Sequence, residues 1–106
     1  MDLEKTKKIV INSLKSVLKD NNIKNITVTE ETEIFGTKSI IDSLQLINLI
    51  VIIEEEVYEI TGEEIIIVDD AAVIVGNSPF KTVQSLTYFV FGKIQVWIFS
   101  KTSLNY

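Results

Sequence analysis

Hydrophobic residues recur at spacings of three and four along the first twenty residues, with lysines between them. The apolar positions are Leu3, Val10, Ile11, Leu14, Val17 and Leu18. This spacing places them on one face of a helix and leaves a polar face for solvent. Asp20, Asn21 and Asn22 favour a turn over a longer helix. We therefore expect a helix over residues 3–19.

Residues 21–41 show no long period and contain Gly36. The pattern predicts an extended connection, and a loop of this length is expected to pack its own side chains onto the core. The side chains expected to do so are Ile23, Ile26, Val28, Ile34 and Phe35.

A dense apolar run begins at Leu44 and ends before three consecutive glutamates. Such a run does not by itself distinguish a helix from a buried strand, and the 18 Ile and 11 Val of the chain favour strand. However, Asp42 and Ser43 provide a good N-cap pair, the pattern continues to Ile60, and Gly62 supplies a stop. These signals predict a helix over residues 43–60.

Shorter elements are expected after residue 62. Residues 65–68 read as a short strand or an extended lead-in, and Asp69-Asp70 as the cap of a brief helix over Ala71–Val75. Ser78 as a cap and Pro79 as the first helical residue predict the start of another helix.

The tail, residues 93–106, leaves three possibilities open: a strand, the continuation of a long helix, or a loosely packed arm. Its Trp97 and Phe99 are expected to cover the bundle rather than to dock a partner, because monomers seldom expose large apolar patches.

Composition removes several classes of enzyme. The chain has 106 residues, no Cys, no His, and only Lys as a basic residue. This excludes a disulfide framework, a thiolate zinc site and a cysteine nucleophile, and it removes the usual base of serine chemistry. We expect one domain and no metal site, and a self-contained hydrolase is disfavoured.

Charge is distributed unevenly along the chain. Residues 30–70 carry twelve acids and one lysine, whereas the segments on either side are each net positive. The acidic middle argues against nucleic-acid binding and suggests a basic partner. The alternative, that these acids only keep an Ile-rich domain soluble, stays open.

No signal peptide is recognisable at the N-terminus, and the longest apolar stretch, residues 44–53, is well short of the roughly 20 residues that span a bilayer. We expect a cytoplasmic protein without membrane insertion.

Ser43 has the best position of the hydroxyl side chains for carrying chemistry. It lies at the predicted start of the 43–60 helix, where free backbone amides and the helix dipole favour an attached or bound phosphate. The alternative is that Ser43 or Asp42 only caps the helix.

The string Ile-Asp-Ser-Leu-Gln-Leu-Ile-Asn-Leu-Ile at 41–50, followed by Glu54-Glu55-Glu56, resembles the acyl carrier protein family, in which Asp-Ser-Leu begins the second helix. Residues 78–86, Ser-Pro-Phe-Lys-Thr-Val-Gln-Ser-Leu, look like the Thr-Val-x-x-Leu segment that opens the last helix of that family. The resemblance covers residues 3–91. It implies an all-α four-helix bundle over residues 1–91, with residues 92–106 as a C-terminal extension of open structure.

The resemblance further implies that Ser43 carries 4′-phosphopantetheine. A separate phosphopantetheinyl transferase would attach it from coenzyme A with magnesium, recognising Asp42 and Leu44. The borrowed thiol would hold an acyl group as a thioester, so the chain itself is not expected to be an enzyme. In this family the acyl chain often lies between the second and third helices, which implies a pocket lined by Ile47, Ile53 and residues of 65–75.

The positions two and five after the serine are usually acidic in the carriers of fatty-acid synthesis, and here they are Gln45 and Asn48. Negative charge persists at Glu54 and Glu55. We expect these four residues to face acyl-loading and acyl-transferring enzymes with basic docking surfaces, in a specialised branch of fatty-acid or lipid metabolism. The carrier is expected to be a monomer.

Other functions stay open. The motif does not separate an acyl carrier from a peptidyl or aminoacyl carrier, and a small acidic helical interaction module without a cofactor is a further alternative. An enzyme built on Ser43 with a lysine base is disfavoured, because no lysine lies within a helical turn of Ser43.

Overall fold

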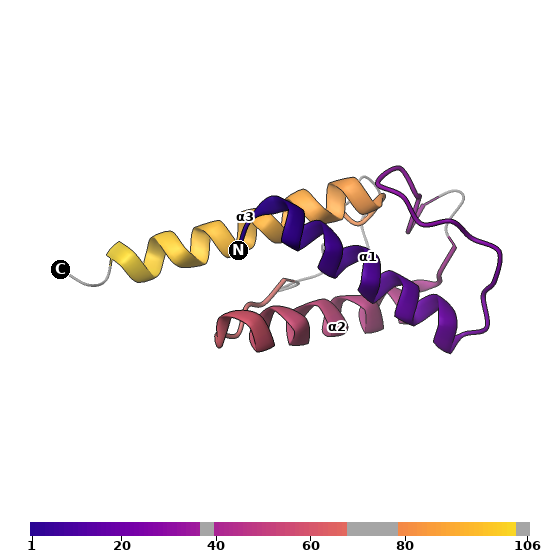
Figure 1. Cartoon of the computed structure of the whole chain (residues 1–106), viewed down its shortest axis with the longest axis horizontal. Helices are drawn as coiled ribbons and strands as arrows, with labels where there is room; N and C mark the ends of the chain where they lie inside the picture. The colour runs from indigo at the N-terminus through magenta and orange to yellow at the C-terminus, as the bar shows by residue number, and fades with distance from the viewer. Residues whose placement is uncertain (37–39, 68–78, 104–106) are drawn as a thin grey trace.

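The computed structural model describes residues 1–36, 40–67 and 79–103, with the side chains of the last helix described up to Val96. It contains three helices, α1 (Leu3–Asp20), α2 (Ser43–Thr61) and α3 (Val83–Ser103) (Figure 1). The described ranges contain no strand beyond an isolated bridge between Glu33 and Thr82. The all-helical class is confirmed. The expected helix over Ala71–Val75 and its Asp69-Asp70 cap lie outside the described residues, so the four-helix bundle stays a prediction.

The first predicted helix is confirmed as α1, which ends one residue later than expected. Asp2 caps it, since one carboxylate oxygen accepts a hydrogen bond of 2.8 Å from the backbone N–H of Lys5. After Asp20 the chain leaves the helix through Asn21, and Asn22 adopts the left-handed conformation (φ 57°) that Asn tolerates better than most residues. The buried positions follow the helical period: Thr6, Ile9, Val10, Ser13, Leu14, Val17 and Leu18.

The predicted helix over 43–60 is confirmed as α2. Asp42 is its N-cap, and Gly62 ends it in the left-handed conformation (φ 77°) while donating its N–H to the carbonyl of Tyr58. The capping signals therefore outweighed the β propensity of the Ile and Val residues between them.

The predicted helix start at Ser78-Pro79 is wrong: α3 begins at Val83, and Ser78 lies outside the described residues. The reason is that Thr82, four residues after Ser78, forms a reciprocal N-cap with Ser85. Thr82 Oγ1 accepts from the N–H of Ser85, and Ser85 Oγ accepts from the N–H of Thr82, both at 3.0 Å. Ser85 Oγ also lies 2.7 Å from the carbonyl of Pro79, which holds Pro79 in the turn before the helix.

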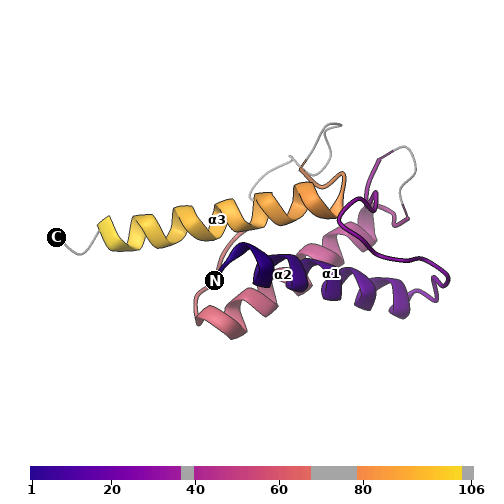
Figure 2. The same cartoon turned by 45° about the horizontal axis from the view of Figure 1, so that its top comes forward.

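For residues 93–103 of the tail, the helical alternative is correct. α3 continues through Gly92 to Ser103, so the expected division at 91/92 falls within one helix. Two views show that its C-terminal half extends beyond α1 and α2 (Figures 1 and 2). Trp97 and Phe99 belong to α3, but their side chains lie outside the described part.

The core is organised around α1, which packs against both α2 and α3, whereas the described parts of α2 and α3 make no comparable contact with each other. Phe80 is almost fully buried and meets Phe89 of α3 edge-to-face, with ring centroids 5.6 Å apart. The long connection contributes as predicted: Ile34 is buried, and Ile23, Ile26, Val28 and Phe35 pack against the core while partly exposed.

Of the expected strand or lead-in over residues 65–68, residues 65–67 belong to an extended segment, 63–67, that is not a strand, and Val68 lies outside the described residues. Ile65 and Ile67 are buried and Ile66 between them is 66% exposed, the alternation of extended backbone. The connection and the start of α3 are joined by backbone hydrogen bonds, including Ile34 N–H to Lys81 O at 2.7 Å and Val83 N–H to Thr32 O at 3.0 Å. None of the described helices is both long and apolar enough to cross a bilayer.

Candidate functional site

Ser43 is the first residue of α2 and is exposed to solvent. The cap of the helix is made by its neighbours: a carboxylate oxygen of Asp42 accepts from the N–H of Gln45 at 2.8 Å, and the side-chain oxygen of Gln45 accepts from the N–H of Asp42 at 2.9 Å. This is a complete capping box. Of the two candidates for a purely structural cap, Asp42 takes the role, and the Ser43 hydroxyl is not used by it.

The residues beside Ser43 differ in their freedom to meet a partner. Leu44 is 68% exposed. Gln45 is half-buried, and its side chain is occupied by the capping box. Asn48, one turn further, is exposed. Of the expected partner residues near the serine, Asn48 is thus the more accessible.

Apolar residues form an exposed strip along the solvent side of α2. Leu44, Ile47, Val51 and Tyr58 are 68, 50, 43 and 52% exposed. Their spacings of three, four and seven residues place them on one side of a helix. Leu44, Ile47 and Val51 fall within the dense apolar run and Tyr58 lies beyond it. The run alone did not distinguish the exposed positions from the buried ones.

Ile47 and Ile53, the residues expected to line an acyl pocket, lie in different surroundings. Ile53 is fully buried in the core, whereas Ile47 belongs to the exposed strip. The structure does not bring the two together. Ile65 and Ile67 are buried members of the core cluster, and residues 68–75 of the expected pocket lie outside the described part of the chain.

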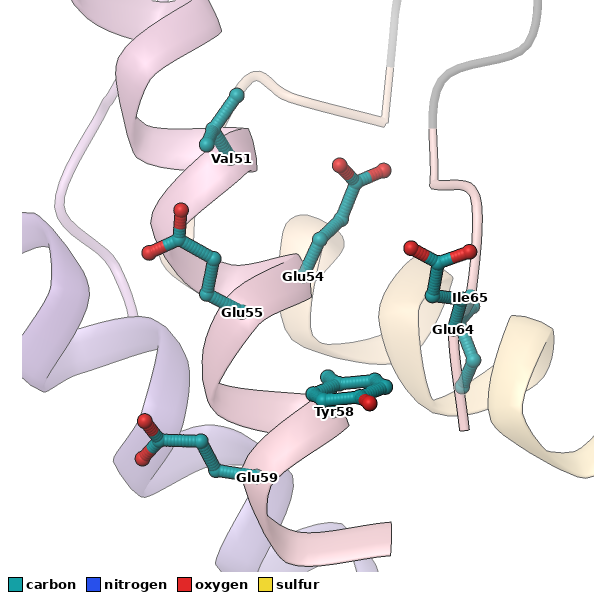
Figure 3. A pocket seen from close by; sticks show the side chains of 7 residues that line it. All are labelled: Val51, Glu54, Glu55, Tyr58, Glu59, Glu64 and Ile65. Carbon is teal, nitrogen blue, oxygen red and sulfur yellow. The ribbon is translucent and has the colours of Figure 1, made fainter. Parts of the chain in front are cut away.

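A cavity of about 340 Å³ lies beside the C-terminal half of α2 (Figure 3). Glu54, Glu55, Glu59 and Glu64 line it together with Val51, Tyr58 and Ile65. Among the described residues, no cluster of three or more acidic side chains has the arrangement required to hold a metal ion. The cavity therefore offers a negatively charged rim around an apolar floor.

Glu54 has a structural task that sequence reasoning missed. One oxygen of its carboxylate accepts a hydrogen bond of 2.8 Å from the backbone N–H of Ile67. The contact fastens the extended segment 63–67 to α2. No sequence signal pointed to it, because the two residues are thirteen positions apart and Glu54 belongs to a run of three glutamates.

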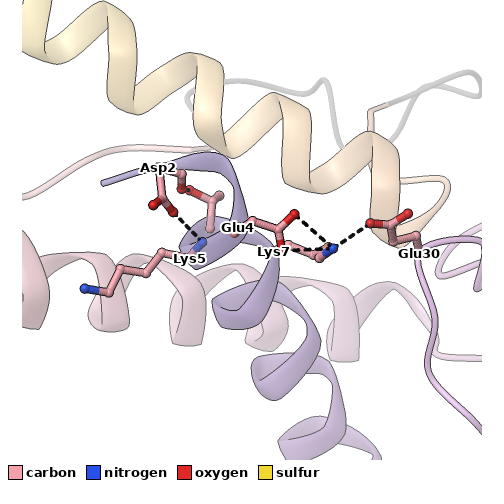
Figure 4. Close-up of polar contacts among 6 residues, drawn as sticks. Asp2, Glu4, Lys5, Lys7 and Glu30 are labelled. Carbon is pink, nitrogen blue, oxygen red and sulfur yellow. Dashed lines mark hydrogen bonds and ion pairs between the residues drawn. The ribbon is translucent and has the colours of Figure 1, made fainter.

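Lys7 joins α1 to the long connection (Figure 4). Its ammonium nitrogen lies 2.8 Å from Glu30 Oε1 and 3.2 Å from Glu4 Oε2. The hydrogen bond to Glu30, and secondarily that to Glu4, raises the pKa of Lys7 above its ordinary value. This ion pair positions the connection and does not contact Ser43.

Comparison with known proteins gives no relative: no family model matches the chain, and no curated protein or solved structure is significantly similar to it.

Proposed function

We propose that the chain is an acyl carrier protein that holds an acyl group as a thioester on a 4′-phosphopantetheine arm attached to Ser43. The supporting observation is the position of Ser43, an exposed hydroxyl at the first position of α2 that the Asp42 cap leaves unused. The string Asp42-Ser43-Leu44, which resembles the carrier motif, occupies this helix start.

The chemistry of the helix start suits such an attachment. A phosphodiester on Ser43 would lie among the unpaired first amides of α2, at the positive end of the helix dipole. The first turn of α2 contains no acidic residue, and the carboxylate of Asp42, which lies beside Ser43 at the N-cap, accepts the N–H of Gln45. The arm would supply the thiol that this cysteine-free chain lacks.

In the proposed attachment, the Ser43 hydroxyl gives up its proton as its oxygen bonds to the phosphorus of coenzyme A that carries the pantetheine group. The pyrophosphate P–O bond breaks, and 3′,5′-adenosine bisphosphate leaves with its electron pair. Asp42 holds the helix start in place, and exposed Leu44 contacts the transferase. The base and the magnesium ion belong to the transferase.

Partner enzymes would meet the exposed strip of α2 and the carboxylates of Glu54 and Glu55. These acidic groups suit the basic docking surfaces expected of acyl-loading and acyl-transferring enzymes. Since Gln45 and Asn48 lack the usual charges, we propose that these enzymes belong to a specialised pathway.

The test is an intact-mass measurement after incubation with coenzyme A, magnesium and a broad-specificity phosphopantetheinyl transferase. We expect the mass of one phosphopantetheine group on the native chain and none on Ser43→Ala. Ser16→Ala, which removes an exposed serine from α1, is the matched control and should be modified fully. Absence of an adduct, or an adduct that persists in Ser43→Ala, would refute the proposal.

A cofactor-free interaction module is the second candidate, favoured by the acid-lined cavity beside Tyr58. It predicts that a basic peptide binds the chain with the same affinity whether or not Ser43 is replaced, while the transferase leaves the mass of the chain unchanged. A peptidyl or aminoacyl carrier would give the same adduct as an acyl carrier and differ in its cargo.

A further inference from the structure

A second cavity lies at the C-terminal end of α1, where the helix passes into the long connection. Its volume is about 460 Å³, within the range of small-molecule sites. Its lining comes from α1 and from residues 22–28. The proposed carrier function uses none of these residues.

The floor of this cavity is apolar. Leu18 is 4% exposed, and Ile23, Ile26 and Val28 are only partly buried although they pack against the core. These side chains therefore leave hydrocarbon surface facing the cavity. The turn that places them is fixed to the helix by the hydrogen bond from the N–H of Ile23 to the carbonyl of Leu18 at 2.9 Å.

The rim is positively charged. Lys15, Lys19 and Lys24 line the cavity, and no acidic residue does. Within the described residues, the ion pairs of α1 involve Lys7 and not these three lysines. Among the described residues, none of the three lysines is therefore ion-paired, although the exposed carboxylate of Asp20 follows Lys19 in the sequence.

Helix stability does not explain this grouping. Lys19 stands in the last turn of α1, where a cation interacts favourably with the helix dipole. Lys15 lies a full turn earlier, and Lys24 lies beyond the helix. In addition, Lys15 and Lys19 are spaced i, i+4, so they repel each other on the helix surface. A bound anion would relieve that repulsion.

We propose that this cavity binds a long-chain carboxylate, with its charged end held by Lys15, Lys19 and Lys24 and its hydrocarbon chain lying on Leu18 and the isoleucines of the turn. A simple anion would leave the apolar floor unused, and a neutral hydrocarbon would leave the lysines unused. The site is independent of Ser43, so it stands or falls separately from the carrier function.

The test is calorimetric titration of the full-length chain with monomeric decanoate at low salt. Decanol carries a chain of the same length without the charge, and acetate carries the charge without the chain. Each should bind at least about tenfold more weakly than decanoate, because the ion pair and the burial of several methylenes each change the dissociation constant by on the order of tenfold or more. Amide shifts in a nitrogen-edited NMR spectrum should concentrate in residues 15–28.

Matched charge reversals test the location. Lys15→Glu/Lys24→Glu should weaken decanoate binding by at least about tenfold. Lys5→Glu/Lys8→Glu changes the net charge equally, at exposed lysines near the other end of α1 (Lys5 is drawn in Figure 4), and should leave binding unchanged. Circular dichroism checks that each variant folds. If Lys15→Glu/Lys24→Glu does not fold, the single substitution Lys24→Gln, which lies outside the helix, is tested in its place.

Three results would overturn the proposal. Equal losses in the two double variants would show a diffuse charge effect rather than a site. Decanol binding as tightly as decanoate would show that the lysines are not used. Binding to vesicles containing anionic phospholipid, without binding of monomeric decanoate, would show a membrane-facing surface instead of a cavity for a single molecule.

Discussion

At the scale of single residues, Asp42 and Ser43 are adjacent but have different structural roles. Asp42 completes the capping box with Gln45, and Ser43 presents an exposed hydroxyl beside it. The sequence predicted the helix start and both residues, but it left open which of them forms the cap. Ser and Asp are both favoured N-caps, so side-chain geometry was needed to decide.

Replacing Asp42 with Ala should destabilise the chain by about 1 kcal/mol, because the N–H of Gln45 loses its acceptor. Ser43→Ala should change the free energy of unfolding by less than about 0.5 kcal/mol, as expected for a surface substitution that breaks no cap. Urea denaturation measures both. Equal losses in the two variants would contradict the assignment of the cap to Asp42.

Replacing Glu30 with Gln should lower the pKa of Lys7 toward its ordinary value of 10.5. The charge-assisted hydrogen bond to Glu30 is the main cause of the upward shift, and a neutral amide would leave only a weaker bond. Glu4→Gln should lower it less. NMR titration of the Lys7 side chain measures both changes, and a larger effect of Glu4→Gln would contradict the order of the two contacts.

The raised pKa of Lys7 also fixes a pH dependence. The Lys7 contact stabilises the fold fully below the ordinary pKa of 10.5 and is lost as the pH rises through the raised value. The stability difference between the native chain and Lys7→Met should therefore be constant at neutral pH and shrink in strong alkali. Denaturation curves at several pH values test this, and a difference that grows with pH would refute it.

At the scale of elements, local signals predicted two helices well and the third only in part. α1 and α2 have apolar periods bounded by strong caps and stops, so the nearest residues determine their ends. The start of α3 depends on the Thr82–Ser85 cap and on the hydrogen bonds of Ile34 and Val83 to partners far away in the sequence. The Ser-Pro pair is a local signal and carries no information about those long-range contacts, so it did not predict where α3 begins.

Two glycines in different settings should respond oppositely to Ala. Gly62 has φ 77° at the end of α2, so Gly62→Ala should cost about 1 kcal/mol even though space is available for the methyl group. Gly92 lies inside α3 with nothing within 4 Å of an added Cβ, so Gly92→Ala should stabilise by roughly 0.5–1 kcal/mol.

Thermal unfolding of the two glycine variants checks these signs. Because about 1 kcal/mol shifts the Tm of a domain of this size by roughly 4–8 °C, the two variants should differ clearly. Destabilisation by Gly92→Ala would show that α3 is not a regular helix at that residue.

At the scale of the whole molecule, α1 is the element that holds the described helices together. It packs on both α2 and α3, and residues from all three helices and from the connections complete one core. The apolar pattern predicted most of the members of this core. It could not predict the two cavities, because each forms where a helix meets a connecting segment that is close to it only in the folded chain.

Leu14→Ala should destabilise the molecule by about 2–5 kcal/mol, because Leu14 is completely buried in the central helix and its truncation leaves a cavity. Leu44→Ala, at a leucine that is 68% exposed, should cost less than about 0.5 kcal/mol. Denaturant unfolding measures both. In the transferase assay Leu44→Ala should nevertheless be modified more slowly, and a normal rate would remove Leu44 from the recognition site.

The separation of the α2 cap from the Ser43 hydroxyl has a thermodynamic consequence. A group added to that oxygen exchanges no hydrogen bond with the cap, so the folding equilibrium and the occupancy of Ser43 are nearly unlinked. Only the interaction of a negative charge with the helix dipole couples them, by at most about 1 kcal/mol at an exposed position. Since linkage is reciprocal, folding would hardly favour or oppose such a group, and under the proposed function its presence would be governed by the rates of the enzymes that attach and remove it.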